Sequence, residues 1–431
     1  MKQVIFILLV FCTSKKNFAQ EYLAEGKNRL NFAKTYFELG GQYSPTFLSK
    51  KPTGSSIQSF ENSASIVPYL NIGGIHFWGH ADFYISIPLA QLNFKKNDST
   101  HFQLNHSVVT GARFLPWAYR DKKIRPFIGA SWAVVNFKQS IKPNGNQPLF
   151  SKNKLLLDAG LLYGKSNFIA RLGVNFFFTN KWNYPITQSS FQQIQTPNWS
   201  AYIGLIYTIE TTRSKNMETE NARLNKYAGL SKPALNALKK GDWFFGIGPS
   251  SSFMLAKSDY NEVNFPYFNK KPISNTYVDI ALGYQFNKAG IVTALSYRNP
   301  KFTNEAYGAK QIIKKNSIAL EVYKFLTDYS GFTPYLGLNL AYDNIEYSEK
   351  TNTTEYNKTC KNINPGITFG WDILPGKTEQ WFVLRTNLRW YPFSKIDING
   401  KAFSQKQMEY NVIQAVFYPS RYKNVKNKRD K

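Results

Sequence analysis

The four histidines of the chain, His76, His80, His101 and His106, all fall within one short window of the sequence. Imidazole nitrogens are common zinc ligands, so this grouping suggests a metal site. The stretch between the two pairs, however, has the length and alternation of a membrane-crossing strand. Such a strand would hold the pairs roughly a membrane thickness apart. We therefore expect no metal and no other cofactor.

Adjacent His106 and Ser107 suggest a second chemistry, in which imidazole activates a serine nucleophile. Neighbouring residues of a strand point to opposite faces, so these two side chains cannot readily share a proton. No acidic third member stands at an obvious partner position. The glycine-rich stretch from Phe244 to Ser251 lacks the helix and the spacing of a phosphate loop. We expect that the chain is not an enzyme, and a lipid-modifying enzyme at a membrane rim is a disfavoured alternative.

The segments that carry these residues show a period of two. In NFIARLGVNFFFT, one face holds Phe168, Ala170, Leu172, Val174, Phe176 and Phe178, while the other holds Ile169, Arg171, Gly173, Asn175, Phe177 and Thr179. The first face is uniformly apolar and the second carries small or polar groups. Many such strands follow one another with no helix between them, which is typical of strands that cross a membrane. Because open sheet edges are not tolerated in lipid, these strands must close into a barrel.

We count sixteen such segments in the chain. The first eight lie near 35–43, 64–76, 81–89, 104–115, 126–137, 154–163, 168–179 and 199–210, and the second eight near 242–253, 273–286, 289–298, 313–325, 333–346, 362–373, 380–391 and 408–418. Short and long connections alternate, as in outer-membrane barrels whose long loops lie outside the cell. The predicted fold is all-β, an antiparallel transmembrane barrel protein.

The second half of the chain repeats the first. RPFIGASWAVVNFKQS (Arg125–Ser140) returns about 208 residues later as TPYLGLNLAYDNIEYS (Thr333–Ser348). Equivalent residues of the two halves are separated by a nearly constant number of positions. They are Pro126 and Pro334, Ser107 and Ser317, Gly160 and Gly366, and Arg171 and Arg385. This pattern predicts an internal duplication of the whole barrel unit.

Each half resembles the eight-stranded outer-membrane barrel family of Gram-negative envelopes, which includes OmpX and the membrane domain of OmpA. The likeness depends on strand count, turn asymmetry and a Pro-aromatic-aliphatic-Gly motif at Pro126–Gly129 and Pro334–Gly337. It implies an integral protein of the cell outer membrane that is delivered by the outer-membrane insertion machinery. Family members usually end on an aromatic residue, whereas a basic tail follows Phe417 and Tyr418 here.

An apolar run, Val4–Cys12, follows Lys2 and is too short to span a bilayer as a helix. Its layout predicts a secretory signal peptide cleaved after Ala19. Cleavage leaves Cys360 as the only cysteine, so no intramolecular disulfide is expected. The predicted organisation is a signal peptide (1–19), a first barrel repeat (20–211), a partly helical periplasmic linker (212–240), a second barrel repeat (241–419) and a basic tail (420–431).

The number of barrels stays open at this point. Eight strands enclose an interior filled by side chains, whereas sixteen leave a water channel. A long linker, where a few residues would suffice, slightly favours two barrels over one. The charged residues expected to face the lumen are Glu38, Asp82, Arg113, Asp158, Arg171, Asp279, Glu321, Asp343, Asp372, Arg385 and Arg389. They would pair in two small barrels, or set ion selectivity in a single wide one.

The formal charge of +27 indicates either an anionic partner or a genome that favours lysine and asparagine. A secreted chain does not meet the chromosome, so we expect that nucleic acid is not a partner. The expected partners are membrane lipid and glycolipid. The lysines expected to contact glycolipid from external loops are Lys50, Lys51, Lys95, Lys96, Lys270, Lys271, Lys314 and Lys315. Ordinary solvation of loops is the alternative explanation for them.

These patterns favour a structural or binding role, in which external loops contact glycolipid or ligands outside the cell. A passive, anion-preferring pore for small solutes, formed by one sixteen-stranded barrel, is the main alternative.

Overall fold

The structure, a computed structural model, describes residues 32–53, 56–76, 79–95, 100–141, 147–178, 180–210, 241–287, 289–326, 332–374, 381–398 and 400–422. The predicted signal peptide (1–19), the linker (212–240), Lys96 and most of the basic tail lie outside these residues. Within them, helices are too short or too polar to cross a membrane.

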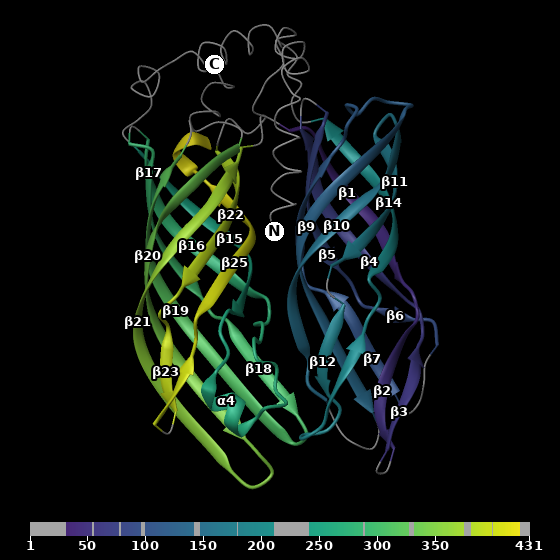
Figure 1. Cartoon of the computed structure of the whole chain (residues 1–431). Coiled ribbons are helices and arrows are strands. Elements are labelled where there is room, and N and C mark those ends of the chain that lie inside the picture. Colours follow the sequence, from purple (N-terminus) through teal and green to yellow (C-terminus); the bar gives the residue numbers. More distant parts are fainter. Residues whose placement is uncertain are drawn as a thin grey trace, which may run out of the picture.

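The first half of the chain forms a closed antiparallel barrel of eight strands (Figure 1). They are β1 (Phe32–Ser44), β4 (Ser65–His76), β5 (Ala81–Pro88), β8 (Val109–Phe114), β9 (Ile124–Ile141), β10 (Phe150–Lys165), β11 (Phe168–Phe177) and β14 (Trp199–Glu210). Each strand pairs with the next in this order, and β1 pairs with both β14 and β4. The ring therefore has no open edge.

The second half forms another closed antiparallel barrel of eight strands. They are β15 (Asp242–Met254), β16 (Tyr277–Phe286), β17 (Ile291–Arg298), β19 (Ala309–Phe325), β20 (Phe332–Lys350), β21 (Glu355–Ile373), β22 (Phe382–Tyr391) and β25 (Gln407–Phe417). Pairing of β15 with β25 closes this ring. Two barrels, slightly favoured from the sequence, are confirmed, and the alternative of one sixteen-stranded barrel is wrong.

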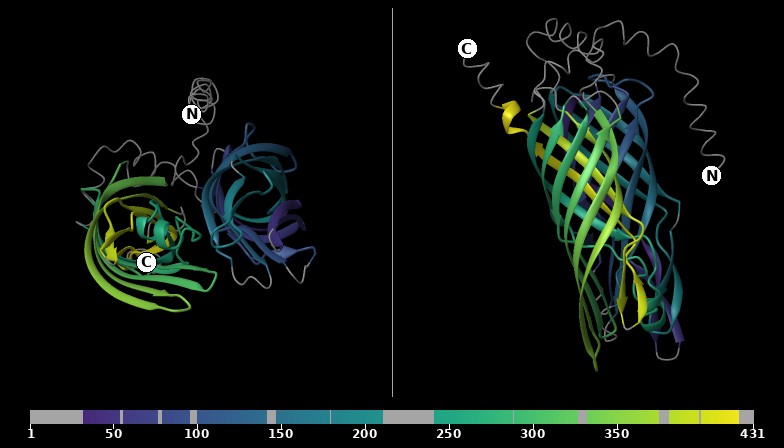
Figure 2. Two further views of the ribbon diagram at one scale, coloured as in Figure 1. Left: turned by 60° about the horizontal axis from the view of Figure 1, so that its bottom comes forward. Right: turned by 90° about the vertical axis from the view of Figure 1, so that its left-hand side faces the viewer.

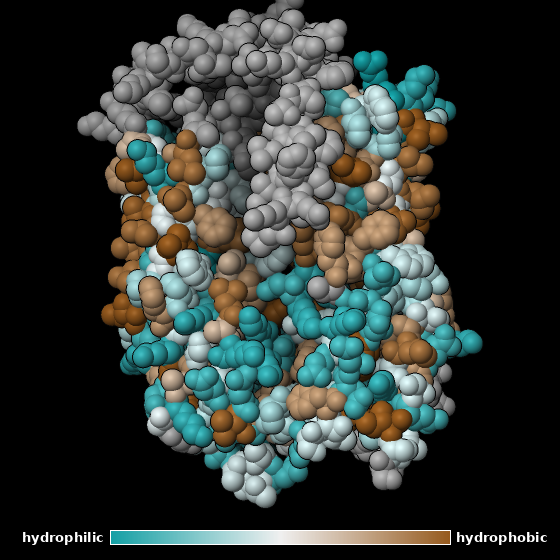
Figure 3. Space-filling view, in the orientation of Figure 1, coloured by the Kyte–Doolittle hydropathy of each residue, from teal (hydrophilic) through white to brown (hydrophobic). Residues whose placement is uncertain are grey.

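Alternation along each strand separates lipid-facing from interior side chains. On β11, Phe168, Leu172 and Phe176 are about half exposed, at 54%, 55% and 50%, whereas Ile169 and Arg171 are buried. Apolar side chains on the outside accumulate into a band over the upper part of both barrels, and polar side chains dominate below it (Figure 3). The band is the surface that a bilayer would cover.

Short additional elements gather at one end of the two barrels, the lower end in Figure 1. They are β2 (Phe47–Thr53), β3 (Ser56–Asn62), β6 (Leu92–Asn93), β7 (Thr100–His106), β12 (Lys181–Pro185), β13 (Phe191–Gln195), β18 (Lys301–Ala306), β23 (Lys395–Ile398), β24 (Lys401–Ser404) and α4 (Asp259–Asn264). They belong to the long connections, which are expected outside the cell, and we call this end the external end.

The two barrels lie side by side in Figure 1 and in the left view of Figure 2, and one behind the other in the right view of Figure 2. The ring of Trp132 on β9 packs against Phe253 and Tyr410 of the second barrel, with centroids 5.1 and 5.4 Å apart. Beyond this contact, the Tyr307 hydroxyl donates to the Pro185 carbonyl at 3.0 Å. The outer faces of the barrels thus form an aromatic seam, and their external ends are joined as well.

Candidate functional site

A buried ion-pair network fills the middle of the first barrel. Arg171 donates from Nη1 to Glu38 Oε2 and from Nη2 to Asp82 Oδ2, both at 2.6 Å. Arg113 donates to Asp158 Oδ2 at 2.6 Å and reaches Asp82 at 3.3 Å. These five residues, all predicted to face the lumen, are buried. Because each charge has an opposite partner within hydrogen-bond distance, the network can persist in a dry interior.

Tyrosines complete this interior. The Tyr36 hydroxyl donates to Asp82 at 2.6 Å, and the Tyr202 hydroxyl donates to Asp158 at 3.0 Å. The cavity beside the network has a volume of only about 30 Å³. That is close to the share of one water molecule in the liquid. Around this network, the first barrel is therefore filled by its own side chains.

The second barrel carries a corresponding network on different residues. Arg389 donates to Glu321 Oε1 at 2.7 Å and to Asp279 Oδ2 at 2.6 Å. Arg385 binds Asp372 through two parallel hydrogen bonds of 2.6 and 2.8 Å. This bidentate geometry is the strong form of the guanidinium–carboxylate pair. All six predicted residues of this half, including Asp343, are buried.

Three further members of this network were missed from the sequence: Arg298, Lys315 and Glu409. Glu409 accepts hydrogen bonds from Arg298 and from the Lys315 ammonium, the latter at 2.6 Å. Arg298 follows Ala294 and Ser296 on the buried face of β17, so period-two alternation could have found it.

The prediction that Lys315 contacts glycolipid from an external loop is wrong. This residue lies on β19 with 2% of its side chain exposed, and points into the barrel. Its neighbour Lys314 is exposed and lies 3.8 Å from Glu346. Adjacent residues of a barrel strand point to opposite faces, so only one member of a lysine pair on such a strand can face outward.

The other predicted glycolipid contacts keep their external setting where the structure describes them. Lys95, Lys270 and Lys271 are exposed, and Lys50 and Lys51 on β2 are partly exposed. Lys270 lies 3.2 Å from Glu262.

The histidines lie in separate environments. His80 Nδ1 lies 2.7 Å from the Leu115 carbonyl oxygen. The two ring nitrogens of His106 lie 3.0 Å from the Ser107 carbonyl oxygen and 3.1 Å from Gln42 Oε1. Ser107 accepts a hydrogen bond from Asn136 through its hydroxyl. Both His106 nitrogens are thus engaged by groups other than that hydroxyl, and the described residues contain no grouping of three metal ligands.

The external end of the second barrel is covered by the segment that contains α4. Its rings, Tyr260, Phe265 and Phe268, belong to a buried apolar cluster with residues of the surrounding strands. The Tyr260 hydroxyl donates to Glu349 at 3.0 Å. Burial, followed by this hydrogen bond to the carboxylate, raises the pKa of Tyr260 to about 12. The cover is therefore a packed part of the fold.

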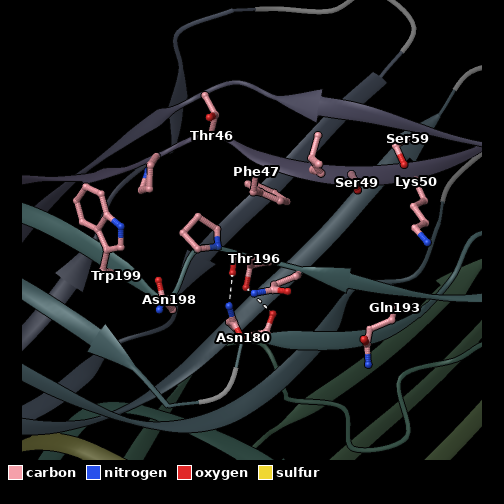
Figure 4. A pocket seen from close by; sticks show the side chains of 14 residues that line it. Thr46, Phe47, Ser49, Lys50, Ser59, Asn180, Gln193, Thr196, Asn198 and Trp199 are labelled. Atoms are coloured by element: carbon pink, nitrogen blue, oxygen red, sulfur yellow. Dashed lines mark hydrogen bonds between the residues drawn. The ribbon is translucent and has the colours of Figure 1, made fainter.

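The first barrel presents a groove at the corresponding end. It lies between the hairpin β2–β3 and the hairpin β12–β13, and has a volume of about 510 Å³ (Figure 4). Its lining combines amide and hydroxyl side chains and Lys50 with apolar side chains, namely Pro45, Phe47, Leu48, Pro197 and the indole of Trp199. Volumes of this size are typical of small-ligand sites. This groove could not be predicted from the sequence, because its walls come from hairpins that carry no membrane alternation.

No family model matches this chain, and no curated protein matches it. Among solved structures, Neisserial surface protein A is 14% identical, with a TM-score of 0.30 over 42% of this chain and 99% of its own. Ail of Yersinia pestis is 15% identical, with a TM-score of 0.29 over 42% and 99%. An outer-membrane channel of Pseudomonas putida F1 is 11% identical, with a TM-score of 0.21 over 90% and 96%.

These scores are too low to carry any inference about function. The strand order and closure of the chain itself place each half in the eight-stranded outer-membrane barrel fold, present here as two successive barrels.

Proposed function

We propose that this chain is an integral protein of a Gram-negative outer membrane, and that its two filled barrels anchor an external surface that binds glycolipid or ligands outside the cell. The basic N-terminal segment would direct its secretion, and the outer-membrane insertion machinery would assemble it. Catalysis is not part of the proposal.

The buried and paired charges inside both barrels are the observation that carries this proposal. Arg171, Arg385 and Arg389 are each at most 1% exposed and pair with carboxylates inside the barrels. Opening a path for solutes would separate charges that are paired in a medium of low dielectric constant, which is costly. This arrangement supports an anchoring role over the passive pore.

The external hairpins supply the surface that such anchors would present. Exposed lysines such as Lys95 and Lys271 carry charge that complements lipid phosphates, whereas Lys270 and Lys314 lie close to carboxylates. Amide and hydroxyl side chains gather between the two hairpins of the first barrel. Both kinds of group suit the phosphorylated sugars of an outer leaflet.

A planar-bilayer recording tests the proposal. The purified full chain, shown to be folded by a heat-modifiable gel shift, should give no stable single-channel openings in potassium chloride. Stable openings near nanosiemens size would overturn the anchoring role and favour a pore. In parallel, detergent-extracted protein should retain glycolipid, and complete absence of binding to glycolipid vesicles would contradict the binding role.

A further inference from the structure

The two barrels differ at their external ends. The second is covered by the α4 segment, whose aromatic side chains pack into a buried cluster. The first keeps an open groove between the edges of β2 and β13. Figure 4 shows polar side chains from both walls arranged around this groove.

We propose that this groove binds the saccharide part of an outer-leaflet glycolipid. The inference rests on the proposed function. It adds to that function a defined site for sugar hydroxyl groups, beyond a general attraction between exposed lysines and lipid.

The lining mixes uncharged polar side chains with apolar ones, a combination that fits the hydroxyls and C–H faces of a sugar better than a charged ligand. Gln193, Gln195 and Asn198 are exposed and line the groove. Amide side chains both donate and accept hydrogen bonds, as sugar hydroxyls do. The lining contains no carboxylate, and its one ammonium, Lys50 Nζ, lies 3.3 Å from Gln192 Oε1. A site for a metal ion or for a highly charged anion would need a more charged lining.

Trp199 supplies an apolar surface for the C–H face of a sugar ring, with 39% of its side chain exposed. Aromatic rings of this kind combine a large apolar face with a polar edge. Trp199 is the first residue of β14. Its side chain lies on the same outward face as Ile203 and Leu205, which are 65% and 57% exposed and face lipid. The groove therefore opens beside the membrane surface, where a sugar attached to a lipid would lie.

The walls of the groove are held in place from behind. Trp182 donates from Nε1 to the Thr196 hydroxyl at 3.1 Å, and Asn180 Nδ2 donates to the Thr196 carbonyl at 2.8 Å. On the opposite wall, Gln139 Nε2 donates to the Lys50 carbonyl at 2.7 Å. A site that is formed before binding loses less conformational entropy when the ligand arrives.

The hairpin β12–β13 is also fixed by the second barrel, because Tyr307 donates to the carbonyl of Pro185 at its end. Gln188 in turn donates to the Tyr307 carbonyl at 3.2 Å. The second barrel thus supports one wall of the site on the first.

The test uses the full chain in phospholipid nanodiscs, with glycolipid of full saccharide length added as vesicles and binding measured by surface plasmon resonance. The variants are the double change Gln193→Ala with Gln195→Ala, and the single change Trp199→Ala. The matched controls are Gln58→Ala, an exposed amide on β3 outside the groove, and Trp243→Ala, an exposed indole at the other end of the barrels.

Each groove variant should weaken binding about tenfold or more, which corresponds to the loss of one or two hydrogen bonds or of one ring contact. The controls should bind as the unchanged chain does. If the groove variants bind as well as the controls while the unchanged chain binds, the groove proposal is overturned and the proposed binding function stands. If the unchanged chain binds no glycolipid, the proposed function fails first.

Two further ligands distinguish a saccharide that is attached to a membrane lipid from a free one. Glycolipid stripped to its acylated disaccharide should lose most of the binding. Free oligosaccharide released from the same glycolipid should bind more weakly than the intact form, because it lacks the attachment that concentrates it at the membrane. Equal binding of the free and the intact forms would overturn the assignment to a membrane-attached saccharide.

Discussion

Arg171 on β11 and Glu38 on β1 are joined by a 2.6 Å hydrogen-bonded ion pair across the interior of the first barrel. The two strands are not neighbours, since β14 lies between them. The same guanidinium reaches Asp82 on β5, which neighbours neither strand. One side chain thus links three separated strands, a restraint that backbone hydrogen bonds between adjacent strands do not provide.

Replacing Arg171 with methionine should destabilise the first barrel by about 3–5 kcal/mol, because Glu38 and Asp82 lose a buried partner. Urea unfolding in lipid vesicles, followed by gel shift, measures the loss. Arg120→Met removes an exposed arginine from the same barrel and should change stability by less than about 0.5 kcal/mol. Equal effects of the two changes would contradict the role of the buried pair.

Lys314 and Lys315 provide a matched pair on one strand. Lys315→Ala leaves Glu409 without one of its two cationic partners and should cost about 3 kcal/mol or more of unfolding free energy. Lys314→Ala removes an exposed charge and should be nearly neutral. The urea concentration at the unfolding midpoint is measured for both variants. A larger loss for Lys314→Ala than for Lys315→Ala would show that Lys315 is not an interior residue.

Gly173→Ala should disturb the interior through Tyr202. A Cβ atom at this glycine would lie 2.5 Å from the Tyr202 ring, so the ring must move and weaken its hydrogen bond to Asp158. We expect a loss of about 1–3 kcal/mol in unfolding free energy. Gly41→Ala is the control, because its added Cβ would meet only an ordinary contact at 3.4 Å. A neutral Gly173→Ala variant would contradict this packing.

The Tyr260 contact in the cover of the second barrel should weaken in the alkaline range. The pKa of Tyr260 is raised to about 12, so its neutral hydroxyl is favoured in the folded state. Its contribution to stability is complete below about pH 10, the ordinary pKa of tyrosine, and is lost as the pH rises toward 12. The difference in tyrosinate absorbance between the unchanged chain and Tyr260→Phe isolates this group. A titration midpoint near pH 10 for the absorbance that Tyr260→Phe lacks would contradict the buried contact with Glu349.

The transmembrane strands could be predicted because lipid imposes a simple rule on them. Every strand that crosses the bilayer must alternate, so the sequence around Phe168 and Leu172 indicates both a strand and its two faces. All sixteen predicted strand segments correspond to barrel strands. The eleven predicted lumen-facing charges lie inside for the same reason.

The external elements and part of the interior network did not follow from that rule. Hairpins such as β12–β13 meet water on one side, so apolar alternation is not required of them. Glu409 was missed for another reason: the pairing register of β25 shifts between its partners Ile247 and Ser250. This bulge changes which residues point inward, so the alternation around Gln414 and Val416 assigns Glu409 to the wrong face.

The aromatic seam has a consequence for how sequences related to this one can vary. Thr110 and Tyr410 are hydrogen-bonded through their hydroxyls across the seam, each on the outward face of its own barrel. A hydroxyl that lost this partner would face an apolar neighbour or lipid, so a change at one position favours a compensating change at the other. Positions 110 and 410 should therefore covary in homologues that retain both barrels, although 300 residues separate them in the chain.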